Sequence, residues 1–338
     1  MFDLLLVLAL LHGALGVASA PGRMLSGWLY PAQGADVGGV RVRYTLGGLR
    51  DSTEAEPAGR FSLALPRQPL PGDSLTVETV DPAGRYLPSL HRLRIDGFEG
   101  ALAVVLVPRR WEIASGLHRG ESIGVDLAAA ARRCERCPSF YPEPSGNDSI
   151  PPRRRGVPAW PDSALPAYLA FDTTAGPRFS ASDTAAFWRA ARTLEEELGR
   201  DLFKHASLAL AMGPPPGDPH GVLIVVADPT IDRSGIGGTG SQAGDILGAS
   251  VSLRSPGLAA MSGGQTLVMH ELMHALGFGH TCAWRSIVSA DRCPQLRAER
   301  PTAEDVAYAQ LLWSIRALER ERGAVGTVGA VLAAEGGD

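Results

Sequence analysis

The stretch that decides the interpretation of this chain is His270-Glu271-Leu272-Met273-His274-Ala275-Leu276-Gly277-Phe278-Gly279-His280. Residues four apart share one face of a helix, so His270 and His274 can turn their imidazoles toward the same point, with Glu271 beside them. Gly277 is expected to end that helix, because glycine readily adopts the left-handed backbone conformation that reverses the chain. The reversal would bring His280 back toward the first two histidines.

Three histidines at this spacing are typical of a catalytic zinc site. Three nitrogen ligands at about 2.0–2.1 Å leave the fourth tetrahedral position for water, which distinguishes a catalytic site from a structural one. Zinc lowers the pKa of that water toward ~7, and Glu271 can accept its proton during attack on a carbonyl. A short His-Glu-x-x-His match recurs by chance, on an ordinary helix with surface histidines, but the glycine and third histidine make the match much more specific. We therefore predict that His270, His274 and His280 bind zinc and that Glu271 is the general base.

The segment resembles the zinc-binding consensus of the metzincin metallopeptidases and is most similar to matrixin-like domains. Downstream, Ser286-Ile287-Val288-Ser289 and the stretch from Pro301 to Tyr308 are similar to the Met-turn and the start of the C-terminal helix of that family. The chain departs from the family at Val288, where the family places a methionine under the metal. Because that residue packs below the site and is not a ligand, valine can substitute with some loss of fit. The resemblance implies a zinc-dependent endopeptidase.

The first twenty residues have the features of a secretory signal. An apolar run from Leu4 to Val17 ends in Ala18-Ser19-Ala20, a small-residue pattern that signal peptidase recognises, although Asp3 replaces the usual positive charge. We predict a signal peptide over residues 1–20 and a secreted or periplasmic location. A membrane anchor is the alternative, but the run is shorter than the ~20 residues that span a bilayer. The apolar stretch within 323–338 is shorter still and is expected to form a mobile tail.

The composition is that of a globular protein long enough for two domains, with 338 residues, 45% hydrophobic and 20% charged. A formal net charge of −4 offers no basic face for nucleic acid, and the arginine clusters at 132–133 and 153–155 lack interleaved aromatic residues. The expected partner is a protein or peptide substrate. The sequence does not determine the oligomeric state.

The four cysteines of an exported chain are expected to form disulfides. Cys282 and Cys293 flank the Met-turn-like segment, and a bridge there would stabilise the floor of the site by ~2–4 kcal/mol. Cys134 and Cys137 form a Cys-x-x-Cys pair, which could be a redox motif or half of a zinc knuckle. We favour a structural disulfide, since no second such pair accompanies it, but the sequence allows all three connectivities.

The N-terminal part, residues 25–108, shows alternating hydrophobicity that predicts an antiparallel β-sandwich. The alternation is clearest from Val40 to Leu46, and the segment from Ala58 to Leu63 resembles carboxypeptidase regulatory-like domains. Because no metal or acid–base constellation occurs there, we expect a support or targeting module. Residues 109–164 are rich in Pro and Arg toward their end and are expected to form a connector.

Residues 165–322 are expected to form an α+β metzincin-like domain, so the predicted fold class is multidomain. A capping box of Ser180 and Asp183 begins a helix that Gly199 ends, and one of Thr302 and Asp305 begins the last helix. On the zinc helix, the core face is predicted to be Met269, Leu272, Met273 and Leu276. The strands are predicted at Leu165–Phe171, Ser207–Met212, Val222–Ala227 and, as an edge strand, Gly248–Ser255. In metzincin-like folds the strand preceding the zinc helix pairs with the substrate backbone.

Between these strands lies the stretch from Asp228 to Gly244, which is rich in Gly, Ser and Asp. Such a loop could bind calcium through oxygen ligands, but glycine-rich loops are more often simple turns, and no fixed ligand spacing is present.

The sequence as a whole predicts an exported zinc endopeptidase, either degradative or a narrow processing or self-cleaving enzyme. The rival hypothesis is a non-catalytic surface-binding protein with a relic metal site, but intact ligands and an intact Glu271 argue against it. The remaining histidines have no partner spacing and are expected to be ordinary surface or core residues: His91, His118, His205 and His220.

Overall fold

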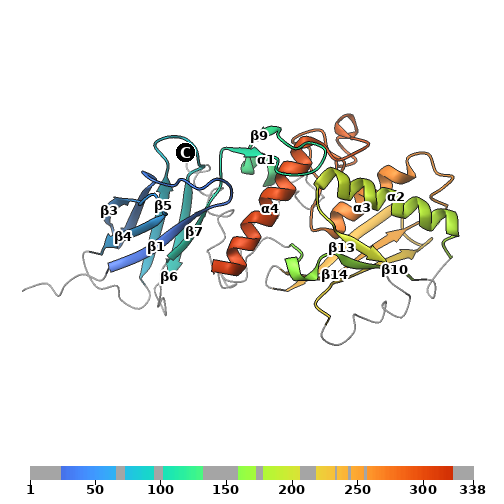
Figure 1. The fold of residues 1–338 in the computed structure, drawn as a ribbon, viewed down its shortest axis with the longest axis horizontal. Coiled ribbons are helices and arrows are strands. Elements are labelled where there is room, and N and C mark those ends of the chain that lie inside the picture. Colours follow the sequence, from blue (N-terminus) through green and yellow to red (C-terminus); the bar gives the residue numbers. More distant parts are fainter. Residues whose placement is uncertain are drawn as a thin grey trace, which may run out of the picture.

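The chain folds into a β-rich structure with several sheets distributed over two regions (Figure 1). The computed structural model describes residues 24–65, 73–94, 102–131, 159–172, 178–205, 218–232, 234–242, 245–254 and 257–322. The expected signal peptide, the expected tail, Cys134, Cys137 and the strand predicted at Ser207–Met212 lie outside the described residues. Among the described helices, none combines the length and apolarity needed to cross a membrane.

The N-terminal region contains two sheets that share one apolar core. One sheet has the order β4 (Arg60–Ala64), β1 (Met24–Pro31), β7 (Leu102–Leu106), and the other has the order β3 (Leu49–Glu54), β2 (Arg41–Leu46), β5 (Ser74–Val80), β6 (Ser89–Arg94). The alternation predicted in β2 is confirmed, because Val42, Tyr44 and Leu46 are all buried. Strand β2 therefore contributes one face to the core, whereas β3 is exposed along most of its length.

One detail of the predicted sandwich is wrong, since the region is not wholly antiparallel. Strand β1 pairs with β4 in antiparallel fashion but with β7 in parallel fashion. The chain enters β7 from the opposite sheet, and it joins β1 along the edge that β4 leaves open. A period-two pattern defines the faces of a strand but not its direction, so the sequence could not distinguish the two pairings.

The C-terminal region is built on one five-stranded sheet. Its order is β11 (Phe203–His205), β10 (Ala167–Asp172), β12 (Val222–Ala227), β14 (Asp245–Leu253), β13 (Gly235–Gln242). The first four strands are parallel and β13 is antiparallel to β14. Helices α2 (Ala181–Leu198) and α3 (Gly264–Ala275) pack together against this sheet in a common core. The predicted capping box at Ser180 and Asp183, and the left-handed Gly199 that ends α2, are both confirmed.

The prediction that Gly248–Ser255 forms an edge strand is wrong. Strand β14 contains most of the predicted edge strand, but it has β12 on one side and β13 on the other, so both of its edges are occupied. The edge on the β14 side of the sheet is formed by β13, which lies within the glycine-rich stretch expected to be a loop. Glycine is a poor strand former by propensity, and here tertiary packing overrides that preference.

Residues 109–131 and 159–164 form ordered structure within the stretch expected to be a connector. They contain β8 (Arg110–Glu112), β9 (Ser122–Gly124), α1 (Leu127–Ala131) and a short 3-10 turn at Asp162–Ala164. Trp111, Leu127 and Trp160 are buried in the core of the C-terminal region. The Trp160 indole donates a 3.0 Å hydrogen bond to the Ala275 carbonyl at the end of α3. These segments therefore belong to the packing around that helix.

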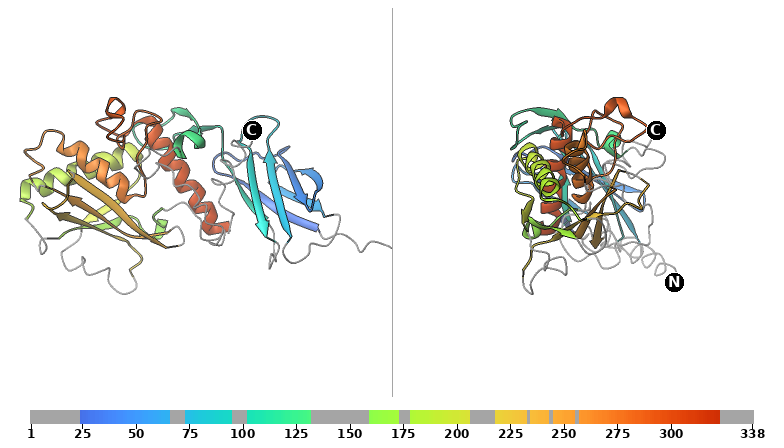
Figure 2. Two further views of the ribbon diagram at one scale, coloured as in Figure 1. Left: turned by 180° about the vertical axis from the view of Figure 1, so that it is seen from behind. Right: turned by 90° about the vertical axis from the view of Figure 1, so that its right-hand side faces the viewer.

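Helix α4 (Ala303–Arg322) lies between the two regions and contacts both (Figures 1 and 2). Ser314 donates a hydrogen bond to the Ala32 carbonyl, and the Arg322 guanidinium lies 5.5 Å from the ring centroid of Tyr30. A second link joins the regions, because the Gln33 side chain bonds the backbone N–H and carbonyl of Glu112 at 2.8 and 2.7 Å. The predicted capping box of Thr302 and Asp305 is present at the start of α4.

Strand β13 packs against α3 so closely that glycine is required at alternate positions. A Cβ built at Gly235 would lie 2.7 Å from the Glu271 Oε1, and one at Gly237 would lie 2.2 Å from the Glu271 carbonyl oxygen. A Cβ at Gly238, on the other face, meets nothing within 4 Å. Glycine at every second position thus allows the backbone of β13 to lie against the helix that carries Glu271 and His274.

We expect Gly237→Ala to destabilise the protein, because its Cβ would collide with backbone that cannot move aside. Overpacking of this kind costs about 1–3 kcal/mol or more, which corresponds to a fall in Tm of roughly 2–10 °C. Gly238→Ala is the matched control and should leave the Tm unchanged or slightly raised. Thermal denaturation followed by circular dichroism compares the two variants. Equal Tm values for both would contradict the packing described here.

Candidate metal centre

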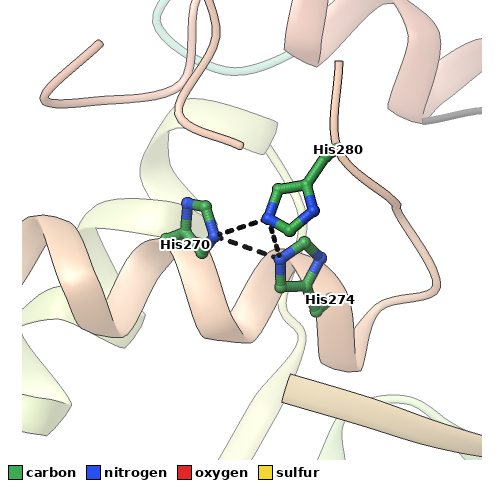
Figure 3. A group of neighbouring side chains, drawn as sticks. All are labelled: His270, His274 and His280. Atoms are coloured by element: carbon green, nitrogen blue, oxygen red, sulfur yellow. Dashed lines mark hydrogen bonds between the residues drawn. The ribbon is translucent and has the colours of Figure 1, made fainter. Parts of the chain in front are cut away.

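The three histidines predicted from the sequence come together in the structure (Figure 3). The Nε2 atoms of His270 and His274 are 3.1 Å apart, and each lies 3.2 Å from the Nε2 of His280. Tetrahedral ligands at about 2.0–2.1 Å from zinc stand about 3.3 Å from one another, so the spacing matches such a site. Among the described residues, this is the group of His, Cys, Asp and Glu side chains arranged to hold a metal ion.

Backbone carbonyls determine which nitrogen of two of these rings faces the centre. The Nδ1 of His270 lies 2.8 Å from the Ile287 carbonyl oxygen, and the Nδ1 of His274 lies 2.6 Å from that of Phe278. A carbonyl can only accept a hydrogen bond, so Nδ1 carries the proton in each ring and Nε2 presents a lone pair. This support from outside the ligand shell is the usual arrangement of metal-binding histidines.

The rings are neutral at physiological pH, because burial lowers the pKa of both His270 and His274 to about 4. Two Nε2 lone pairs that face each other at 3.1 Å without a proton between them repel. A metal ion bound between the two rings would remove that repulsion. A proton would not do so at neutral pH, because the pKa of both rings is about 4. The donor set therefore fits a metal ion that prefers imidazole ligands.

The end of α3 brings the third histidine into place. The helix ends at Ala275, and Gly277 has a φ of 102°, in the left-handed region. Its N–H donates to the His274 carbonyl at 2.9 Å, and the turn carries the chain back toward His280. The reversal predicted at Gly277 is thus confirmed. The predicted core face of α3 is also confirmed, since its four apolar residues are at most 1% exposed: Met269, Leu272, Met273 and Leu276.

Glu271 lies on the same helix as the first two histidines but is not part of the group of converging ligand atoms. Its side chain is buried, with 4% exposure, and its carboxylate lies against Gly235 of β13. This placement leaves the three histidines as the group that could hold a metal ion. It also brings the carboxylate to the junction between α3 and the edge strand.

The floor of the centre is fixed by the buried carboxylate of Asp305, which accepts four hydrogen bonds. Its Oδ1 accepts from the Trp284 indole at 3.0 Å and the Ser286 hydroxyl at 2.6 Å, and its Oδ2 accepts from two backbone N–H groups, of Ile287 at 3.0 Å and Thr302 at 3.1 Å. Burial raises the pKa of this carboxyl, while the hydrogen bonds act in the opposite direction.

Asp305 thereby supports His270 through one residue. The N–H of Ile287 bonds to Asp305, and the carbonyl of Ile287 accepts from His270. The sequence predicted only the capping role of Asp305. Its contact with the Ser286–Ser289 segment depends on how α4 returns to the site, and the sequence carries no local signal for that.

The segment from Ser286 to Ser289 is almost completely buried, and Val288 has no exposed surface. The predicted disulfide between Cys282 and Cys293 is confirmed and closes the loop around this segment. The isolated histidines stay apart from the centre. His91 is buried in the N-terminal region, where burial lowers its pKa to about 4, and His220 bonds to Asp218 at 2.6 Å.

Comparisons with known proteins leave the chain without an assigned family. No family model matches the sequence, and no curated protein does. One similar solved structure is a proposed carbohydrate-binding protein from Bacteroides uniformis ATCC 8492, with 12% identity and a TM-score of 0.21 over 27% of this chain and 44% of that one. Another is a carbohydrate acetylesterase from Xanthomonas citri, with 14% identity and a TM-score of 0.15 over 62% of this chain and 48% of that one. The chain thus spans about half the length of either protein, and these similarities are too low to indicate a fold.

We expect Asp305→Asn to weaken both the fold and the metal centre. An amide presents one NH2 group where the carboxylate has an acceptor, so at least one pair of buried donors loses its partner, at a cost of about 2–4 kcal/mol. Without its bond to Asp305, Ile287 should shift and hold the ring of His270 less firmly. This change should lower metal affinity by about 10–100-fold, as loss of support outside the ligand shell typically does. The measurements are urea denaturation and zinc titration. Glu304→Gln, one residue away and partly exposed, is the control. An Asn variant that matches the parent in both would disprove this role.

Proposed function

We propose that the chain is an exported zinc-dependent endopeptidase whose C-terminal region is a matrixin-like metzincin domain. The observation that carries this proposal is the convergence of three Nε2 atoms at 3.1–3.2 Å from one another, with Glu271 on the same helix as His270 and His274. We further propose that the N-terminal region is a carboxypeptidase regulatory-like β-sandwich. The location, secreted or periplasmic, follows from the predicted signal peptide and is part of the proposal.

A zinc ion held by the three histidines would acidify a water molecule and polarise the carbonyl of the peptide bond. Glu271 accepts a proton from the water as the oxygen attacks the carbonyl carbon, and it gives that proton to the amine nitrogen as the C–N bond breaks. The backbone carbonyls of Ile287 and Phe278 hold two of the rings in the required tautomer.

Strand β13 supports the proposal because it offers an open sheet edge beside Glu271. Within the described residues β13 pairs with β14 along one edge, and no described strand occupies the other. An extended peptide can add to such an edge through main-chain hydrogen bonds. A peptide bound in this way would lie close to Glu271, since Gly235 of β13 contacts the Glu271 carboxylate. Calcium, which the sequence only allowed, is not part of the proposal, because much of the glycine-rich stretch forms β13.

The purified chain is expected to hold about one zinc per molecule, because three converging imidazoles form a catalytic-type ligand set. His274→Ala should lose most of that zinc, since two ligands hold the ion poorly. His220→Ala is the control, because His220 is paired with Asp218 and stays outside the centre. Metal analysis after equilibration with zinc and dialysis gives the zinc content per chain of all three proteins. The absence of zinc from the parent chain would end the proposal.

Glu271→Gln should keep zinc and the fold but lose peptide hydrolysis by about 10²–10⁴-fold, the usual cost of removing a general base. The amide occupies the same space but cannot accept the proton of water. Cleavage of a peptide library, with and without chelator, provides the rates. Equal rates for parent and variant would refute the mechanism. A parent that holds zinc but cleaves no peptide would instead favour the relic-site hypothesis.

A further inference from the structure

The segment that forms the wall and floor of the metal centre is positively charged, in contrast to the chain as a whole. Residues 281–300 contain four arginines against one Asp and one Glu, while the chain carries a formal net charge of −4. A local charge of sign opposite to that of the molecule attracts ligands of the other sign to that place.

Arg297 lies beside the residues that support His270. Its backbone forms a bridge to Ser286, with hydrogen bonds of 2.9 Å from Ser286 to Leu296 and from Ala298 to Ser286. The carbonyl of Ile287, the residue after Ser286, accepts the hydrogen bond from His270. Arg297 therefore lies on the His270 side of the centre.

The guanidinium of Arg297 is accessible to a ligand. Its side chain is 55% exposed and pairs with Asp291, whose side chain is 97% exposed, at 3.2 Å. An ion pair this exposed is weak, so another carboxylate can replace Asp291. Arg300, three residues away and 56% exposed, is different, because it pairs at 3.3 Å with the buried carboxylate of Glu197. Arg300 is thus directed toward α2 and serves as a natural control.

We infer that Arg297 binds an acidic side chain of the peptide substrate, close to the bond that is hydrolysed. A guanidinium can bind a carboxylate through two parallel hydrogen bonds, which favours Asp or Glu over their amides. The inference rests on the proposed peptidase function and adds a substrate class to it. A bound peptide would also shield this pair from water, which strengthens it relative to the exposed pair with Asp291.

The test uses the full chain and three peptides that differ at one position beside the cleaved bond, with Glu, Gln or Lys. The parent is expected to cleave the Glu peptide with a kcat/KM about tenfold above that of the Gln peptide, the effect of one charge-assisted hydrogen bond. Arg297→Gln should abolish this preference and Arg297→Glu should shift it toward Lys. Arg300→Gln should retain it, because that arginine faces Glu197.

A second readout is independent of catalysis. In the Glu271→Gln background, fluorescence anisotropy gives the Kd of each uncleaved peptide, and the added Arg297→Gln change should weaken binding of the Glu peptide alone. A parent that cleaves the three peptides equally, or a preference that survives Arg297→Gln, overturns this inference while leaving the peptidase function intact. A parent that holds zinc but cleaves nothing overturns the proposed function, and this inference with it.

Discussion

The buried carboxylate of Asp305 is the constraint on which the metal centre depends. It joins the first turn of α4 to the segment from Trp284 to Ile287 through four hydrogen bonds. Ile287 then fixes the ring of His270. A charge in this position is costly to bury, and only its full set of donors makes it tolerable. The orientation of the His270 ring therefore depends on a residue that does not face the centre.

Local features of the sequence predicted much of the site. The spacing of His270, His274 and His280 indicated the ligand set, and the structure brings these rings together because a helix and a glycine turn are determined by a few adjacent residues. The capping boxes and the Cys282–Cys293 disulfide were likewise predictable from short spacings. Each of these features depends on residues that are close together in the chain.

Features that depend on long-range packing were not predictable. Strand β13 forms where propensity favours a loop, because Gly235 and Gly237 allow the backbone to lie against α3. The parallel pairing of β1 with β7 and the burial of Trp160 depend on segments far apart in the sequence. A pattern of alternating residues does not specify the neighbour of a strand, and it does not show which strand has the free edge. These are the features that decide where a substrate could bind.

Helix α4 limits how the two regions of this protein could be exchanged during evolution. Its Ser314 and Arg322 contact the N-terminal region, while its Asp305 completes the metal centre, and Gln33 is joined to Glu112 across the same boundary. A gene fusion or exchange that replaced the N-terminal region alone would leave one side of this helix without its partners. The two regions are therefore expected to be inherited as a pair, and recombination between unrelated proteins at residue 108 should seldom give a working molecule.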